Sequence, residues 1–245
     1  YVFFRGGFLR TKVHLQMAAF VFLLLICFSY FLESFHFSLA VSADSADAAQ
    51  DVTVLIDAGH GGVDGGAVAG DGTEEKHINL QIARLLEQQL GAMGIRTAMT
   101  RTSDVSIHDS SAQTIREKKV SDIHNRMQLM EETETCIFVS IHQNKYSDSA
   151  LSGTQVFYSP NTTASAQLAQ TIQDSVQTLL QPENSREIEK SGSSIYLLYY
   201  AQKPAVLVEC GFLSNAEDLR KLKDETYQKQ LAFCIAAGIL EYLNT

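Results

Sequence analysis

Three polar residues that could act together on a substrate follow three separate apolar runs of the chain. His60 follows residues 52–59, His142 follows residues 136–141, and Glu209 follows residues 205–208. Each run is short and rich in β-branched residues, which is typical of a buried strand. In an open α/β sheet, ligands gather outside the carboxyl ends of the strands. Two imidazoles and a carboxylate at three such ends therefore predict a metal-assisted active site.

A metal site of this kind needs a third ligand beside the two histidines. Catalytic zinc typically takes three nitrogen or oxygen ligands and keeps a fourth position for water. Glu75 begins the first predicted helix and can reach back over the sheet edge where His60 lies. Its neighbour Glu74 is also acidic, and both carboxylates could simply favour a helix amino terminus through the helix dipole. Either histidine, taken alone, is more often a polar cap on a strand.

Glu209 is a carboxylate that directly follows four apolar residues. A carboxylate on a buried strand is costly unless it is paired, bound to a metal or used in chemistry. Beside a metal it can take a proton from bound water and pass it to a leaving nitrogen. We therefore expect Glu209 to act as a general base and acid.

The glycine-rich loop at residues 59–66 could also suggest a nucleotide-binding loop. The dinucleotide pattern needs glycine where Asp64 stands, and no Gly-Lys-Ser/Thr sequence follows. A phosphate loop should also run straight into a helix, whereas the predicted helix begins well beyond this loop. The nucleotide hypothesis is therefore weak.

Composition excludes two further classes of function. The 245 residues carry a net charge of −9, and no basic stripe is present that could neutralise the phosphates of a nucleic acid. The four cysteines form no Cys-x-x-Cys pair, which argues against a zinc–thiolate site or a disulfide framework. We expect no nucleic-acid partner, and cysteines that behave as small buried hydrophobes.

The elements that must position the candidate residues alternate along the chain. Amphipathic spacing predicts helices at residues 75–93, 122–132, 163–180 and 227–243. Strands are expected at residues 52–58, 95–100, 136–141, 153–158, 195–200 and 205–208. A polar loop is expected at 183–193, and the polar segment at 101–120 is expected to be a surface loop or partly helical. Such alternation predicts a single α/β domain with a mostly parallel twisted sheet of about six strands, flanked by helices on both faces.

The amino-terminal segment has a different character from the rest. Arg5, Arg10 and Lys12 precede an apolar run at 17–32, and small polar residues follow to residue 50. This order is typical of a signal peptide, and the run is slightly short for a membrane span, which needs about 20 apolar residues. Residues 1–50 are thus expected to be a signal peptide or membrane anchor plus linker, ahead of a catalytic domain at 51–245. Both alternatives place the domain outside the cytoplasm.

Several motifs, taken together and in order, resemble one known family. They are Asp57-Ala58-Gly59-His60-Gly61-Gly62, Glu75-Lys76, Asn79-Leu80, Thr100-Arg101, Arg126, Ser140-Ile141-His142-Gln143-Asn144 and the eight residues from Val208 to Asn215. The chain resembles the zinc-dependent N-acetylmuramoyl-L-alanine amidases over residues 52–243. Any one of these motifs alone would not be specific.

The resemblance implies a set of roles for the candidate residues. His60, Glu75 and His142 match the ligands of one Zn²⁺, with Glu75 chosen over Glu74, and Glu209 matches the catalytic glutamate. It also implies that the substrate is peptidoglycan and that the amide between N-acetylmuramic acid and L-alanine is hydrolysed. Cys210 stands where valine is more usual, and we expect little effect from this apolar exchange.

Within the family, the chain most resembles the germination-specific amidases of spore-forming bacteria. The shared features are the export segment, the polar insertion at residues 104–121 and the sequence at 194–198. This likeness implies removal of stem peptides in the spore cortex, coupled to a muramic acid deacetylase that completes the muramic δ-lactam. Residues 146–153 leave no room for the inhibitory helix of the division-type relatives.

Several alternatives stay open at the level of sequence. The chain could be a general cell-wall autolysin, a non-catalytic peptidoglycan-binding protein, or a zinc peptidase that cuts within the stem. An accessory activating protein and an N-terminal membrane attachment are also open, as are the oligomeric state and stem-peptide specificity.

Overall fold

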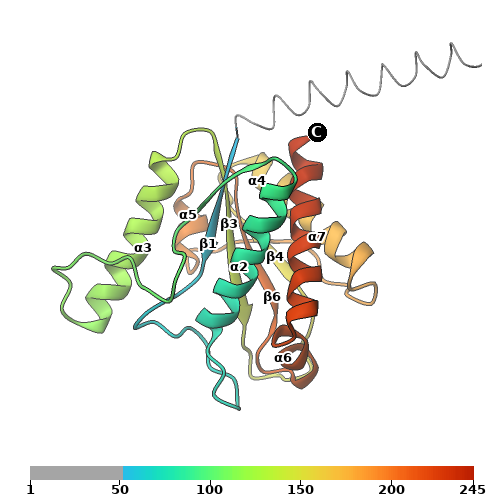
Figure 1. Cartoon of the computed structure of the whole chain (residues 1–245), viewed down its shortest axis with the longest axis horizontal. Helices are drawn as coiled ribbons and strands as arrows, with labels where there is room; N and C mark the ends of the chain where they lie inside the picture. Colours follow the sequence, from blue (N-terminus) through green and yellow to red (C-terminus); the bar gives the residue numbers. More distant parts are fainter. Residues whose placement is uncertain (1–51) are drawn as a thin grey trace, which may run out of the picture. The chain divides into compact units, whose positions relative to one another are not determined.

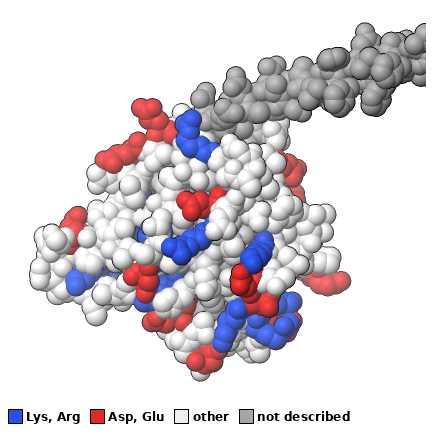
Figure 2. Space-filling model, viewed as in Figure 1, with Lys and Arg blue, Asp and Glu red and all other residues white. Residues whose placement is uncertain are grey.

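The computed structural model describes residues 52–245. The signal or anchor segment predicted for residues 1–50, with Cys27, lies outside the described residues. Within residues 52–245, no helix is long and apolar enough to cross a membrane. On the face shown in Figure 2, lysine and arginine side chains lie interspersed with aspartate and glutamate side chains.

A six-stranded sheet forms the centre of the domain (Figure 1). Its strands are β1 (Thr53–Ala58), β2 (Arg96–Met99), β3 (Cys136–Asn144), β4 (Gln155–Tyr158), β5 (Glu189–Lys190) and β6 (Ala205–Phe212), in the spatial order β2-β1-β3-β6-β4-β5. All neighbouring pairs are parallel except β4 and β6, which run antiparallel. The predicted α/β domain with a mostly parallel sheet of about six strands is confirmed.

Helices cover both faces of this sheet because alternate strand residues point to opposite sides. On β1, Val54 and Ile56 enter the larger apolar core, and Leu55 enters a smaller one. The larger core is covered by α2 (Glu75–Ala92), α4 (Thr163–Leu179) and α7 (Glu225–Leu243), and the smaller by α3 (Ile115–Glu132) and α5 (Tyr196–Tyr200). The short helix α6 (Ala216–Leu222) follows β6.

The helical layer over the larger core is closely packed. Gly238 of α7 faces α4, and a Cβ atom added there would lie 2.5 Å from the Cα atom of Ile172. Since real side chains do not approach so closely, glycine is what allows the two helices to meet. Gly94 follows the end of α2 with φ of +79°, a left-handed conformation that favours glycine after a helix.

The strand predicted at residues 195–200 is wrong, because this segment is the helix α5. In a strand, Leu197 and Leu198 would face opposite sides of the sheet, yet both are buried in the smaller core while Tyr199 and Tyr200 are exposed. The segment is rich in β-branched and aromatic residues, which suggested a strand. The place beyond β4 is taken instead by β5, from the segment predicted as a polar loop.

Helix α3 begins at Ile115, seven residues before the predicted start. Thr114 and Glu117 form a capping box there: the Glu117 backbone N–H donates to Thr114 Oγ1, and Thr114 N–H donates to Glu117 Oε2. Because no apolar stripe marks the first turns, periodicity placed the start too late. Helix α6 was not predicted either, although Asn215 caps its first turn.

Candidate metal centre and active site

Strand ends bring the predicted residues to one edge of the sheet. His60 lies just beyond β1, His142 lies on β3, and Glu209 lies on β6 directly opposite His142 in the strand register. Glu75 is the first residue of α2. One ligand atom each from His60, Glu75 and His142 lies within 4.8 Å of the others. We call these three residues the ligand cluster.

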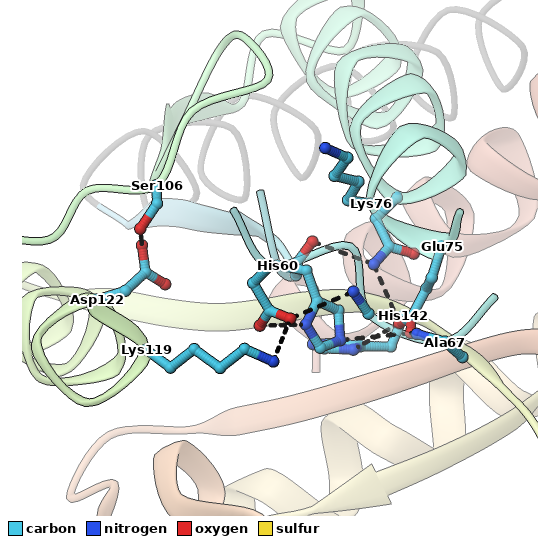
Figure 3. Close-up of polar contacts among 12 residues, drawn as sticks. His60, Ala67, Glu75, Lys76, Ser106, Lys119, Asp122 and His142 are labelled. Atoms are coloured by element: carbon cyan, nitrogen blue, oxygen red, sulfur yellow. Dashed lines mark hydrogen bonds and ion pairs between the residues drawn. The ribbon is translucent and has the colours of Figure 1, made fainter. Parts of the chain in front are cut away.

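Glu75 lies between the two histidines of the ligand cluster (Figure 3). Its Oε1 is 2.9 Å from His142 Nδ1, and its Oε2 is 3.3 Å from His60 Nε2. Burial would raise the pKa of this carboxyl, but the hydrogen bonds and charges of the two imidazoles hold it well below its usual range. Glu74 is half-buried and contacts Lys76 and His77 instead, so Glu75 is the carboxylate that faces the two histidines of the cluster.

Backbone and amide groups fix the Glu75 side chain further. Oε2 accepts the N–H of Ala67 at 2.8 Å, and Oε1 accepts the N–H of Gln143 at 3.0 Å. Asn79 donates from Nδ2 to the same Oε1 at 3.1 Å. The pairing of β3 with β6 shifts register between His142 and Asn144, and such irregularities often re-aim groups beside active sites. Here the irregularity coincides with the Gln143 N–H that binds Glu75.

His60 is held in one orientation by its own loop. Its φ is +62°, a left-handed conformation that is unusual for a residue with a side chain. Its Nδ1 is 2.8 Å from Asp64 Oδ2, and Asp64 Oδ1 is 2.7 Å from Lys119 Nζ (Figure 3). Burial opposes the charged imidazole, but the hydrogen bonds of Asp64 and Glu75 raise the pKa of His60 to about 9. Because Asp64 occupies Nδ1 of His60, it is Nε2 of His60 that faces Glu75 in the ligand cluster.

Two buried arginines hold the backbone of this loop. Arg101 donates from Nε to the carbonyl of Ala58 at 2.8 Å and from Nη2 to that of Gly59 at 3.0 Å. Arg126 donates from Nη2 to the His60 carbonyl at 2.7 Å and forms an ion pair with buried Asp57. Burial alone would raise the pKa of Asp57, but Arg126 and the Ser140 hydroxyl lower it to about 2.

Two glycines allow the ligands to approach one another. A Cβ atom on Gly59 would lie 2.2 Å from His142 Nε2, and one on Gly66 would lie 2.6 Å from Glu75 Oε2. No side chain fits at these distances. The absence of a side chain at Gly59 and Gly66 therefore permits the close approach of the ligands.

Glu209 is placed differently from the ligand cluster. Its Oε2 is buried without a hydrogen-bond partner among the described residues. Burial is the main cause that raises its pKa to about 7, with the Glu75 charge adding to the shift and the histidines opposing it. Glu209 and His142 both line a cavity of about 250 Å³ between the sheet, α3 and α5, with Ser140 and Tyr196 on its walls. A base here can meet a substrate group in the cavity.

The remaining histidines and cysteines of the described chain lie outside this cluster. His77 contacts Glu74, His108 contacts Ser106, and His124 is exposed on α3. Cys136, Cys210 and Cys234 are buried and free, as predicted for small hydrophobes.

Sequence reasoning missed most of the residues that support the site. It assigned no role to Asp64, and it quoted Asn79, Arg101 and Arg126 only as parts of motifs. The one signal available was local: Asp64 stands four residues after His60 in a glycine-rich loop, within reach of its ring.

Comparison with known proteins gives one consistent result. A family model described as N-acetylmuramoyl-L-alanine amidase matches residues 54–241. The germination-specific N-acetylmuramoyl-L-alanine amidase of Bacillus subtilis is 34% identical over 191 residues, which cover 78% of this chain and 79% of that protein. An uncharacterized protein, YqiI, of the same organism is 35% identical, with 84% and 92% covered. The CwlD amidase of Clostridioides difficile, solved in complex with the GerS lipoprotein, is similar with a TM-score of 0.75 and 38% identity, covering 78% of this chain and 98% of that one.

Proposed function

This chain belongs to the N-acetylmuramoyl-L-alanine amidase family, and from that premise we propose which of its groups carry out the hydrolysis and where it acts. It is an N-acetylmuramoyl-L-alanine amidase of peptidoglycan. The proposal concerns the metal, the roles of individual residues and the biological setting.

We propose that the ligand cluster holds one Zn²⁺. Two imidazole nitrogens and a carboxylate oxygen within 4.8 Å of one another suit zinc, whereas magnesium and calcium prefer oxygen ligands alone. The carboxylate of Asp64 on His60 Nδ1 is the outer partner that metal-binding histidines usually have. When bound, zinc supplies a Lewis acid that lowers the pKa of water toward about 7 and polarises a carbonyl.

Glu209 is proposed as the proton carrier. Its carboxylate accepts a proton from the attacking water as the new C–O bond forms on the lactyl carbonyl carbon. It then gives this proton to the nitrogen of L-alanine as the C–N bond breaks, so the products are a lactyl carboxylic acid and a free amine. Burial raises the pKa of the Glu209 carboxyl above its usual range, which suits a group that must both accept and give up a proton near neutral pH.

The observation that carries this assignment is the unpaired Oε2 of Glu209, buried on the cavity that His142 also lines. The experiment is mass spectrometry of muropeptides after incubation with the zinc-loaded wild type and with Glu209→Gln. The wild type should release a free L-alanine amine, whereas the variant should keep its zinc and release almost none. Cleavage within the stem would identify a peptidase, and wall binding without release would identify a scaffold. An active Glu209→Gln enzyme would refute the assignment.

The biological setting is proposed to be the spore cortex. The support is the likeness to the germination-specific amidase of Bacillus subtilis and to the CwlD amidase. Removal of stem peptides there would be the first step toward muramic δ-lactam, which a deacetylase completes. Spores of a strain that lacks this protein should contain cortex without δ-lactam. Normal δ-lactam together with a defect in cell separation would instead indicate a general autolysin.

An accessory lipoprotein is proposed as a partner, and export as the route to the substrate. The similar CwlD amidase was solved in complex with the GerS lipoprotein, and peptidoglycan lies outside the cytoplasm. Residues 145–154, between β3 and β4, contain no helix, so control by a helix inserted at that place is not expected. Zinc uptake by the purified chain, measured with and without a candidate lipoprotein, tests the need for a partner.

A further inference from the structure

A group of aromatic side chains lies on α5 beside the catalytic cavity. Tyr196, Tyr199 and Tyr200 are spaced three and four residues apart and share one face of the helix. The ring centroids of Tyr196 and Tyr200 are 4.8 Å apart, and those of Tyr199 and Tyr200 are 5.1 Å apart. His124 of α3 extends the group, with its ring 5.4 Å from Tyr196. We call these four side chains the aromatic face.

The aromatic face reaches the surface, and the helix that carries it is fixed to the rest of the domain. Tyr199 is 40% exposed and Tyr200 is 53% exposed, whereas Leu197 and Leu198 anchor the helix in the smaller core. Asn161 donates to the carbonyls of Tyr199 and Ala201, which fixes the carboxyl end of α5. Large exposed side chains on a rigid element are characteristic of a binding surface.

The aromatic face continues the active site. Tyr196 lines the same cavity as Glu209 and His142, so one ring of the face belongs to the wall of the catalytic cavity. His124, whose ring lies beside that of Tyr196, also lines a second hollow of about 610 Å³ bounded by Asp109, Thr114 and Val120. A long substrate held at Glu209 can therefore run across the tyrosines.

The segment that carries the face has no charge. Residues 191–202 contain no aspartate, glutamate, lysine or arginine. The stem peptide of peptidoglycan carries carboxylates, which a basic surface would bind, whereas the sugars linked through muramic acid are neutral where the stem is attached. The uncharged face thus matches the glycan side of the substrate better than its peptide side.

We infer that the aromatic face of α5 binds the glycan strand of peptidoglycan by stacking pyranose rings against Tyr196, Tyr199 and Tyr200. This inference rests on the proposed function, because it assigns a place to the sugar of the same substrate. A pyranose ring presents polarised C–H bonds on its faces, and an aromatic ring carries negative charge density on its own faces. The hydroxyls at the sugar edge stay in contact with water.

The experiment measures glycan binding apart from hydrolysis. A neutral tetramer of N-acetylglucosamine, which has no amide to the stem, is titrated into the full chain and followed by NMR. Tyr200→Ala should weaken its binding about fivefold, within the range expected for loss of one aromatic contact. Tyr200→Phe keeps the ring and should bind like the wild type. Phe233→Ala removes an exposed aromatic side chain of α7 on the opposite helical layer, and it should also bind like the wild type.

A second measurement uses stem-bearing muropeptides. Tyr200→Ala should raise KM about fivefold with little change in kcat, because the face binds sugar in the ground and transition states alike. The inference is overturned if all variants bind the tetramer with equal affinity, or if the wild type does not bind it. The aromatic face would then be assigned to contact with a protein partner. Continued hydrolysis by the wild type in that case leaves the proposed function intact. If the wild type binds the tetramer but does not hydrolyse muropeptides, the proposed function is refuted and the glycan binding is not.

Discussion

The ligand cluster and Glu209 stand at the same sheet edge, but their surroundings differ sharply. Both carboxylate oxygens of Glu75 accept hydrogen bonds, from Ala67, Gln143 and Asn79, and Asp64 holds the ring of His60. Glu209 has an Oε2 without a hydrogen-bond partner in the described chain. Groups that hold an ion gain from a rigid frame, whereas a group that moves protons must keep an oxygen free. We therefore predict that changes in the ligand cluster reduce zinc binding, whereas changes at Glu209 reduce turnover and leave zinc in place.

The largest effect is expected from removal of a ligand. His142→Ala should lose zinc and reduce amide hydrolysis by about 10⁴-fold or more, because the metal and its effect on water are lost together. Elemental analysis and single-turnover hydrolysis measure the two losses. His77→Ala is the matched control at an exposed histidine outside the cluster and should keep its zinc. Full zinc occupancy in His142→Ala would remove this residue from the ligand set.

Glu209→Gln should retain zinc and lower kcat by about 10²- to 10⁴-fold, the usual contribution of a general acid–base group. The wild-type rate should fall as pH decreases through about 7 or below, because the base must be deprotonated and a cation in the cluster can only lower its pKa. In Glu209→Gln this fall in rate at low pH should be absent. If the variant shows the same fall, the titrating group is not Glu209.

Asp64→Asn should weaken zinc binding by about 10- to 100-fold, the usual effect of losing an outer partner of a metal-bound histidine. Competition with a zinc chelator measures the affinity. Lys119→Ala removes only the exposed ion pair to Asp64 and should change the affinity by no more than about fivefold. A larger loss of zinc affinity in Lys119→Ala than in Asp64→Asn would contradict the proposed role of Asp64 in holding His60.

Asp57→Asn should leave the ligands in place but lower the free energy of unfolding by about 3 kcal/mol at pH 7, since it leaves buried Arg126 without one of its carboxylates. The folded pKa of Asp57 lies below its unfolded value. Its contribution is therefore complete above about pH 4 and is lost as pH falls toward about 2. Urea unfolding at several pH values should show the wild type and the variant converging in acid.

The sequence allowed the central buried strands, and His60, His142 and Glu209 at their ends, to be predicted, because β-branched runs that end in a polar residue are visible locally. The supporting contacts were not visible in the same way. Arg126 and Asp57 are 69 residues apart, and their pairing depends on how α3 crosses the sheet. The spacing of apolar residues did not reveal α5, which is only five residues long, or the first turns of α3, which have no apolar stripe. Glu75 was separated from Glu74 by family likeness, and the structure then placed its carboxylate between the histidines.

The parallel pairing of His142 with Glu209 has a practical consequence. Two residues opposite each other on adjacent strands keep the backbone spacing of the sheet, about 4.8 Å. The distance between the backbones of His142 and Glu209 is therefore set by the pairing of β3 with β6 and does not depend on the outer loops. Segments such as 104–121 or 191–202 could then be exchanged between homologues to alter preference for wall material while the chemistry is inherited unchanged.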